Sequence, residues 1–578
     1  MAGGAVYASD DPAEALQSLF ADERAYYYAE NPGTGPRGKP RPVADRMPAG
    51  SLDDERRREA ANKAFMKRLG KIDRAKLSDE GKLNYDMFRY MLESRLTAAK
   101  HRTWRMPLYS DSGFHTYPTR MWQSVNFKTA DDYRAYIRRL QDMPRFLEEN
   151  ITHLRTGMKD GFTMPKVVLD GLLPTFGAIA DKTAEESSFL GPFKAMASGV
   201  SVEEQDVLRQ EALRVIGEEV LPAYKRLAQF MEAEYYVAAR DAIGVSEVPG
   251  GRAYYEDMVR YYTTVDISAE EVHQIGLREV ARIRGAMEKI IEEVGFEGSF
   301  ADFLKFLRSD PQFYAKTEKE LLMFASYLAK KVDGRLPSLF GKLPRQPYGV
   351  EPVPAVLAPN YTTGRYSGAP LDAPRGGEYW VNTYALDKRP LYTLPALTLH
   401  EAVPGHHLQI ALSKELENVP EFRLGLYPHA FGEGWGLYSE RLGEEIGLYE
   451  TPYERFGRLT YEMWRACRLV IDTGIHMKGW TRQQAIDLLA NNSALSMHNI
   501  RTEVDRYISW PGQALAYKMG ELKLVELREK ATAALGDKFD VRGFHDRVLS
   551  AGGIPLYILE SRIDSWVQSQ LNEENNGR

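Results

Sequence analysis

Apolar side chains recur at helical spacing along most of this chain. Leu16 is followed three and four residues later by Leu19 and Phe20, which places all three on one face of a helix over residues 11–30. Similar stripes predict helices over 53–69, 82–100, 130–155, 202–240 and 267–333. The Pro- and Gly-rich stretch 31–50 predicts a loop. The sequence shows no fixed-period self-similarity, so we do not expect a solenoid.

The pattern changes between residues 335 and 398, where ten prolines exclude one long helix. Within this region, residues 378–384 combine aromatic and β-branched side chains, which predicts a β-strand. Helical spacing resumes at Thr398 and continues to the end of the chain. We therefore expect a mainly α fold with a small β-sheet. Its helical N-terminal part would cover 1–335 and a second part 336–578, intertwined as one structural unit.

Composition narrows the class of protein. Of 578 residues, 43% are apolar and 27% charged, which is typical of globular proteins and excludes collagen-like, mucin-like and largely disordered chains. The net charge of -6 gives no reason to expect nucleic-acid binding. No apolar run reaches the length of a membrane span. The single cysteine, Cys467, excludes an intrachain disulfide and a thiolate metal cage. The composition leaves open whether the protein forms a homodimer.

The N-terminal residues leave the compartment open. Residues 1–8 lack the charged and apolar regions of an intact signal peptide. The small residues at 6–8 fit the scar of a cleaved signal peptide, which would make the protein periplasmic or secreted. An ordinary frayed terminus fits at least as well, and would agree with a cytoplasmic protein.

Histidines concentrate in one region of the sequence. Six of the 11 lie between residues 400 and 498: His400, His406, His407, His429, His476 and His498. Neutral imidazole is the commonest metal ligand, although a chance cluster of structural histidines is the alternative. The stretch HEAVPGHHLQ (400–409) favours a metal site, because it begins with His-Glu and returns to histidine a turn or two later.

The spacing of this stretch differs from His-Glu-x-x-His, in which both histidines bind zinc from one helix face and the glutamate is a general base. On an unbroken helix, His406 would lie about 240° around the axis from His400. His407 would return to within about 20°, but roughly 10.5 Å along the axis. Pro404 removes a backbone donor, and Gly405 tolerates backbone angles that other residues avoid. We therefore expect a bulged helix that returns the second histidine to the metal.

A catalytic zinc site also needs a third protein ligand and an open position. Glu433, within HAFGEGWGLYSE (429–440), is the best candidate because it begins a helical run between glycines that allow close approach. A carboxylate favoured by the helix dipole is the alternative. His429 is a rival ligand. Glu440 lies seven residues after Glu433, on the same face, and could orient a ligand histidine.

Five motifs carry a family resemblance: EYWVNT (378–383), HEAVPGHHLQ (400–409), GEGWGLYSE (432–440), CRLVIDTGIHMKGWT (467–481) and EVDRYISWPGQALAYKMG (503–520). The stretch 378–561 resembles the domain-of-unknown-function family 885. That family in turn resembles zincin-type metallopeptidases whose third ligand is glutamate. The resemblance implies a mostly helical peptidase-like fold with a deep central cleft, one side of it formed by the N-terminal part, and one Zn2+ ion.

More distant likenesses suggest roles for single residues. Dipeptidyl peptidase III also has glycine before its second ligand histidine, which favours His406, whereas the His-Leu-Gln tail resembles angiotensin-converting enzyme and favours His407. The Arg506-Tyr507 stretch also resembles that enzyme. It implies Tyr507 as the oxyanion donor and His498 as a contact to a substrate carbonyl. A tyrosine packed at a helix end is the alternative.

These assignments predict a zinc-dependent hydrolase, most simply a metallopeptidase of the carboxypeptidase or dipeptidase type acting on short peptides. Glu401 would take a proton from zinc-activated water and pass it to the leaving amine. The strand 378–384 could pair with an extended peptide, or be a plain internal strand. Hydrolysis of a non-peptide amide or ester, and a binding protein with a vestigial metal site, stay open.

Further residues are candidates for the second shell of the metal or for substrate binding, and inter-helix salt bridges are the alternative for each. Arg468 or Lys518 could bind a C-terminal carboxylate, as in a carboxypeptidase. The full set is Glu440, Arg468, Asp472, His476, Arg506, Tyr517 and Lys518.

Overall fold

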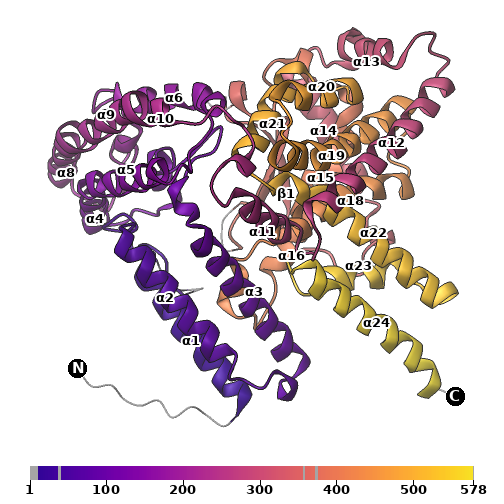
Figure 1. The fold of residues 1–578 in the computed structure, drawn as a ribbon, viewed down its shortest axis with the longest axis horizontal. Coiled ribbons are helices and arrows are strands. Elements are labelled where there is room, and N and C mark those ends of the chain that lie inside the picture. Colours follow the sequence, from indigo (N-terminus) through magenta and orange to yellow (C-terminus); the bar gives the residue numbers. More distant parts are fainter. Residues whose placement is uncertain (1–10, 37–38, 40, 356–357, 372–374, 577–578) are drawn as a thin grey trace. The chain divides into compact units, whose positions relative to one another are not determined.

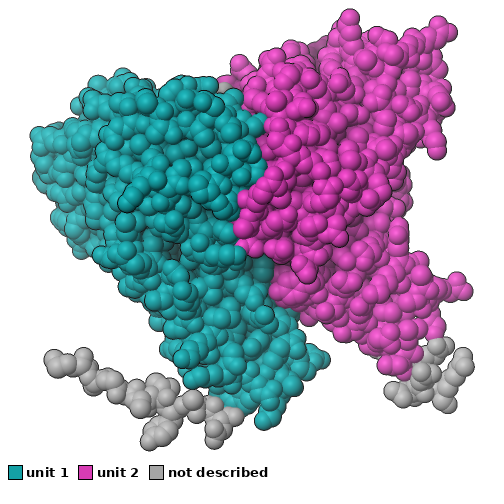
Figure 2. Space-filling view, in the orientation of Figure 1, with its two compact units in different colours: residues 1–251, 420–425 teal, residues 252–419, 426–578 magenta. Residues whose placement is uncertain are grey.

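The computed structural model describes residues 11–36, 39, 41–355, 358–371 and 375–576. The candidate signal-peptide scar at 6–8 lies outside these residues. The chain divides into two compact units (Figures 1 and 2). Unit 1 comprises residues 1–251 and 420–425, and unit 2 comprises 252–419 and 426–578.

Unit 1 is helical, as the apolar periodicity predicts. The stripe in the first helix is confirmed, because Leu16, Leu19 and Phe20 are all buried. The Ser51 side chain caps the second helix by accepting a hydrogen bond from the backbone N–H of Asp54. The Asp54 side chain in turn accepts one from the backbone N–H of Ser51. The helices are α1 (Pro12–Glu30), α2 (Leu52–Leu69), α3 (Asp79–His101), α4 (Ala130–Gln141), α5 (Met143–Lys159), α6 (Lys166–Ala180), α7 (Gly191–Lys194), α8 (Val202–Val215), α9 (Leu221–Phe230), α10 (Tyr236–Ala238) and α17 (Glu421–Leu424).

The helix expected over 130–155 is two helices, α4 and α5, which meet at Asp142. Pro144 lies in the first turn of α5 and has no N–H to donate to the carbonyl four residues earlier, so the first helix cannot continue through it. The segment 202–240 is helical as expected. It contains π-helical turns at 216–220 and 231–235 between α8, α9 and α10.

Unit 2 carries the candidate chemistry on a second set of helices. Its longest helix, α19, is buried along most of its length, including Cys467, and packs against α12, while α18 packs against α22. The helices are α11 (Gly251–Thr263), α12 (Ala269–Glu293), α13 (Phe300–Ser309), α14 (Glu318–Asp333), α15 (Leu394–Glu401), α16 (His406–Lys414), α18 (His429–Glu445), α19 (Pro452–Lys478), α20 (Arg482–Asn492), α21 (Met497–Ser509), α22 (Ala516–Leu535), α23 (Val541–Leu549) and α24 (Leu556–Asn576).

A three-stranded sheet occupies the proline-rich region of unit 2. Its strands are β1 (Tyr348–Pro352), β2 (Gly364–Ser367) and β3 (Gly377–Val381), in the order β1–β3–β2. The expected strand is confirmed as β3. The suggestion that it could add a peptide strand is wrong, because β1 pairs with it in parallel and β2 pairs with it antiparallel, so both of its edges are occupied.

The sheet lies beside the helix that carries the His-Glu pair. The Tyr379 hydroxyl of β3 lies 3.3 Å from the hydroxyl of Thr398 in α15, and both groups are buried.

The helices and the small sheet together confirm the prediction of a mainly α protein with a small sheet. Among the helices that the structure describes, none is both long and apolar enough to cross a membrane.

Candidate metal centre

The chain between the two histidines of the motif is not helical. α15 ends at Glu401, α16 begins at His406, and the Val403–Pro404 peptide bond between them is cis. The expected bulged helix is therefore two separate helices. The expectation that Gly405 takes backbone angles that other residues avoid is confirmed, since its φ of -70° and ψ of -129° lie outside the α and β regions. A Cβ there would lie 2.0 Å from the His400 carbonyl oxygen, so the position has no room for any side chain.

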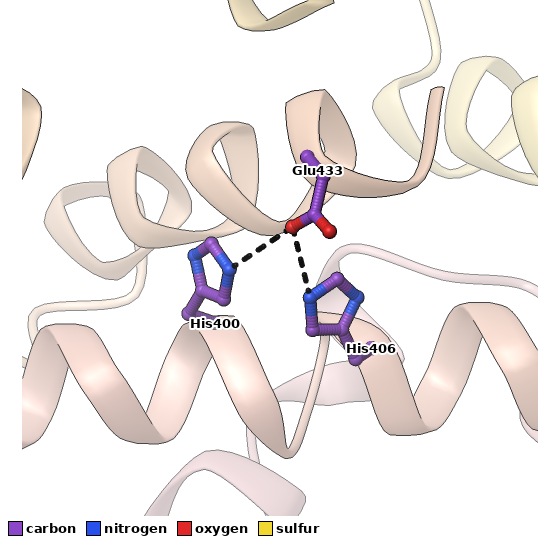
Figure 3. Close-up of side chains that lie close together, drawn as sticks. All are labelled: His400, His406 and Glu433. Atoms are coloured by element: carbon purple, nitrogen blue, oxygen red, sulfur yellow. Dashed lines mark ion pairs between the residues drawn. The ribbon is translucent and has the colours of Figure 1, made fainter. Parts of the chain in front are cut away.

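The break brings three candidate ligands together, as Figure 3 shows. One nitrogen each of His400 and His406 and one oxygen of Glu433 lie within 4.8 Å of one another. Glu433 Oε2 lies 3.5 Å from His406 Nε2 and 3.9 Å from His400 Nε2. Glu433 is in the second turn of α18, one turn after His429. We refer to His400, His406 and Glu433 as the triad.

His407 and His429 lie apart from the triad. The His407 Nδ1 atom lies 3.0 Å from the Tyr366 hydroxyl, and the ring packs against Tyr348. The ring of His429 packs among aromatic rings, including that of Tyr427. Of the two histidines that the sequence left open as the second ligand, the structure thus places His406 beside Glu433.

Glu440 lies directly behind the first ligand. Its Oε1 is 2.8 Å from His400 Nδ1, and both side chains are buried. Arg465 Nη2 lies 3.8 Å from the same oxygen. A carboxylate in this place holds the imidazole with Nδ1 protonated, which leaves Nε2 free to bind a metal.

The glycines of α18 permit this packing. A Cβ on Gly434 would lie 2.5 Å from the backbone of Gly520 in α22, and a Cβ on Gly436 would lie 2.8 Å from the His400 ring. The expectation that glycines next to Glu433 allow another backbone to approach is therefore confirmed for Gly434.

Electrostatics separate the two imidazoles of the triad. Burial, and then His406, hold the pKa of His400 well below its usual value. Burial would also lower the pKa of His406, but Glu433 and Glu401 outweigh it and raise that pKa. Burial would raise the pKa of Glu433, but the two histidines hold it far below its usual value. The carboxylate is thus ionised and one imidazole neutral, which are the forms that bind metals.

Glu401 is held beside the triad by a strand. Its Oε2 accepts a hydrogen bond of 2.8 Å from the backbone N–H of Tyr366 in β2. Burial raises the pKa of Glu401, while His406 opposes this effect. A general base needs a pKa closer to neutrality than that of an ordinary glutamate, and this shift is in that direction.

The tyrosine predicted as the oxyanion donor is engaged elsewhere. The Tyr507 hydroxyl accepts hydrogen bonds from Trp464 Nε1 at 2.8 Å and Arg468 Nε at 2.9 Å, and the side chain is only 1% exposed. Burial, the largest effect, raises the pKa of this hydroxyl. His498, predicted to contact a substrate carbonyl, is exposed in the first turn of α21.

Two other tyrosines lie against the triad. The Tyr517 ring stacks with the His400 ring at an interplanar angle of 21° and a centroid distance of 6.4 Å. The Tyr427 hydroxyl donates to Glu433 Oε1 at 3.4 Å. In the sequence, Tyr517 was only one of many candidates, and Tyr427 and Tyr366 were not among them. Nothing in their local sequence marks them, since Tyr427 lies in the loop before α18 and Tyr366 in the proline-rich region.

The remaining candidates are anchored in buried polar networks. Lys518 contacts three carboxylates at 2.8–3.0 Å, those of Glu279, Glu462 and Glu521, so it cannot serve as a carboxylate receptor without breaking them. Asp472 Oδ1 accepts hydrogen bonds from the Tyr255 hydroxyl and the Gly512 amide.

His476 is likewise structural, with its Nε2 2.9 Å from the Tyr507 carbonyl oxygen. Arg468 Nη2 pairs with Glu503 at 2.8 Å. Arg506 Nη2 donates to Gln513 Oε1 at 2.6 Å and to the Tyr517 hydroxyl at 3.4 Å.

The donor set of the triad fits a zinc ion. Two imidazole nitrogens and one carboxylate oxygen are a ligand set found in catalytic zinc sites, where a fourth position stays open. For bonds of about 2.0–2.1 Å, tetrahedral ligand atoms lie roughly 3.3 Å apart. The contacts of Glu433 with His406 and His400, at 3.5 and 3.9 Å, are close to that separation.

Comparisons with known proteins place the chain in a family but give no activity. The profile of a family described as bacterial protein of unknown function (DUF885) matches residues 32–563. A crystal structure described as a "putative lipoprotein" from Colwellia psychrerythraea superposes with a TM-score of 0.88 at 28% identity, over 98% of this chain and 100% of that one. No curated protein matches.

A second solved structure supports the fold alone. A "putative lipoprotein of unknown function" from Shewanella oneidensis superposes with a TM-score of 0.71 at 19% identity. The match covers 96% of this chain and 99% of that one. The overall fold is therefore shared by proteins whose sequences have diverged widely.

Proposed function

The chain belongs to the DUF885 family of bacterial proteins of unknown function, and we propose that it is a zinc-dependent hydrolase of the glutamate-ligand zincin type that cleaves short peptides. One observation carries the proposal. The side chains of His400, His406 and Glu433 come together from α15, α16 and α18. Two further acidic residues, which such chemistry requires, lie next to them. Glu401 follows the first ligand, and Glu440 holds that ligand from behind.

Each of these residues would have a separate role in amide hydrolysis. A bound zinc ion would act as a Lewis acid toward a substrate carbonyl and lower the pKa of water at the site. Glu401, held by the Tyr366 amide, would accept the proton of the attacking water and deliver it to the leaving nitrogen. Glu440 would keep the His400 ring fixed throughout.

Tyr517 and Tyr427 replace Tyr507 as the proposed donors to the developing oxyanion. Both lie against the triad, whereas the Tyr507 hydroxyl is already engaged by Trp464 and Arg468. Donors placed where negative charge develops lower the barrier for acyl transfer. We expect the tyrosine that acts to be revealed by a fall in kcat with little change in KM on substitution to phenylalanine.

The proposal is tested by metal analysis and by turnover. Protein purified without chelator should contain about one zinc ion per chain, and a panel of short peptides, acyl amides and esters should identify the bond that is cleaved. Glu401→Gln should lower kcat by about 10²–10⁴-fold and keep the metal. Glu417→Gln, at an exposed position after α16, is the matched control.

Each alternative has its own outcome. Cleavage of esters or acyl amides but not peptides would keep the zinc site and replace the substrate class. Substoichiometric metal together with no turnover would indicate a vestigial site. Full activity of Glu401→Gln would remove Glu401 from the mechanism.

A further inference from the structure

Two guanidinium groups near the triad share one carboxylate. Arg468 Nη2 lies 2.8 Å from Glu503 Oε2, and Arg506 Nη1 lies 3.5 Å from Glu503 Oε1. A guanidinium is always charged in proteins, so this group of three side chains carries one excess positive charge. The Arg468 Nη1 atom is also buried without a hydrogen-bond partner.

The neighbouring acids do not remove this excess. Asp472 lies one turn after Arg468 in α19, but its Oδ1 accepts from Tyr255 and Gly512, and burial raises its pKa to about 7. It therefore carries only part of a charge at neutral pH. Lys518 shows the opposite situation, because three carboxylates surround that single cation. The group of Arg468, Arg506 and Glu503 therefore keeps its excess positive charge.

Arg506 is the member of this group that a ligand can reach. Its side chain is 26% exposed, whereas that of Arg468 is 2% exposed. Arg506 Nη2 lies 3.4 Å from the Tyr517 hydroxyl. The Tyr517 ring in turn stacks with the His400 ring. One aromatic ring therefore separates an accessible guanidinium from the triad.

We propose that Arg506 binds a carboxylate of the substrate next to the bond that is cleaved. This inference rests on the proposed hydrolase function and specifies its substrate class: peptides with a free C-terminal carboxylate or an acidic side chain beside the scissile bond. The planar fork of an arginine binds carboxylates with two parallel hydrogen bonds. The groups that engage this fork are the neutral Gln513, the Tyr517 hydroxyl at 3.4 Å and, through a long contact, Glu503.

The test compares three peptides of otherwise identical sequence: one with a free C-terminus, one with a C-terminal amide, and one with a C-terminal amide and a glutamate as the last residue. The wild-type protein should cleave one carboxylate-bearing peptide with a kcat/KM about tenfold to a hundredfold above that of the plain amide. The free acid and the glutamate peptide distinguish the two sources of the carboxylate.

Substitutions then assign the preference to Arg506. Arg506→Gln should bring the ratio of kcat/KM for the acid peptide to kcat/KM for the amide peptide close to one. Arg506→Lys should keep part of the preference for the acid because the charge remains. Arg501→Gln, at an exposed position in the same helix, should leave the ratio unchanged. The ratio is independent of the fraction of protein that is folded, so a merely structural role of Arg506 would not change it.

A binding measurement separates this inference from the hydrolase proposal. Calorimetric titration of the Glu401→Gln variant with N-acetylphenylalanine and with its amide reports carboxylate recognition without turnover. A preference for the acid that is lost on adding Arg506→Gln supports the inference even if no peptide is cleaved, in which case only the hydrolase proposal fails. Cleavage of acid and amide peptides at equal rates, or an unchanged ratio in Arg506→Gln, overturns the inference and leaves the hydrolase proposal standing.

Discussion

Glu440 Oε1 lies 2.8 Å from His400 Nδ1, and neither side chain has more than 3% of its surface exposed. In the absence of metal, burial raises the pKa of Glu440 to about 8, although Arg465 and Arg458 oppose this shift; zinc bound at His400 Nε2 would favour the carboxylate form. Burying an acid and an imidazole together costs free energy, because both groups lose hydration. We attribute the burial of this pair to a functional role, which is to fix the orientation of a metal ligand.

Replacing Glu440 should therefore weaken metal binding without removing a ligand. Glu440→Gln is expected to lower zinc affinity by about 10–100-fold, because the amide cannot hold the His400 ring as a carboxylate does. Competition with a chromophoric chelator measures the affinity. Glu444→Gln, at a partly exposed position one turn later in α18, should change it little. Equal affinities for wild type and Glu440→Gln would show that the contact is only structural.

Metal content should distinguish the two adjacent histidines. His406→Ala removes a member of the triad and is expected to reduce bound zinc far below one ion per chain. His407→Ala removes a ring that contacts Tyr366 and Tyr348 and should keep the metal, although it loses packing. Elemental analysis after dialysis gives the answer. Loss of zinc from His407→Ala in a folded protein would reverse the assignment.

A single methyl group should disturb the site from the side of α18. A Cβ at position 436 would lie 2.8 Å from the His400 ring, and Glu440 holds that ring in place. Gly436→Ala is thus expected to weaken zinc binding and lower thermal stability. Gly285→Ala in α12, where a Cβ meets nothing within 4 Å, should instead stabilise the helix by about 0.5–1 kcal/mol. Matched melting curves and zinc titrations compare the two variants.

Acid should destabilise unit 1 through His115. This side chain is buried, its ring stacks on Phe176, and burial lowers its pKa to about 4. The unfolded chain has the ordinary value near 6.5, so it binds the proton first as the pH falls. Stability is therefore complete above pH 6.5 and is lost between pH 6.5 and 4, by about 3 kcal/mol in total.

His115→Phe removes this titration and keeps the stacking surface. The variant should lose less stability than the wild type between pH 6.5 and 4. From pH 7 to 8 the stabilities of both proteins should depend on pH in the same way. Thermal unfolding at a series of pH values gives the comparison. Thr175 keeps a hydrogen bond to the Leu172 carbonyl oxygen in the variant, so it is not left unpaired. Identical slopes in acid would show that His115 does not titrate as proposed.

Local pattern was sufficient for much of the fold. The helices near 11–30 and 53–69 and the strand near 378–384 followed from periodicity and residue type, because each signal lies within one element. Pro144 was visible in the sequence, but periodicity continued across it and hid the break between α4 and α5. The pairing of β3 on both edges depended on strands contributed by other segments, so no local signal could show it.

By itself, the sequence determined the residue types available for chemistry. It provided a His-Glu pair, a second histidine after a proline and a glycine, and a carboxylate among glycines, and these features led to His400, His406 and Glu433. Only the tertiary structure showed that His406 and not His407 lies beside Glu433, because this depends on the direction of the chain through a non-helical linker. It also decided which tyrosines face the triad. Tyr517 and Tyr427 reach it through contacts between distant segments, whereas Tyr507 lies in a buried network with Trp464 and Arg468.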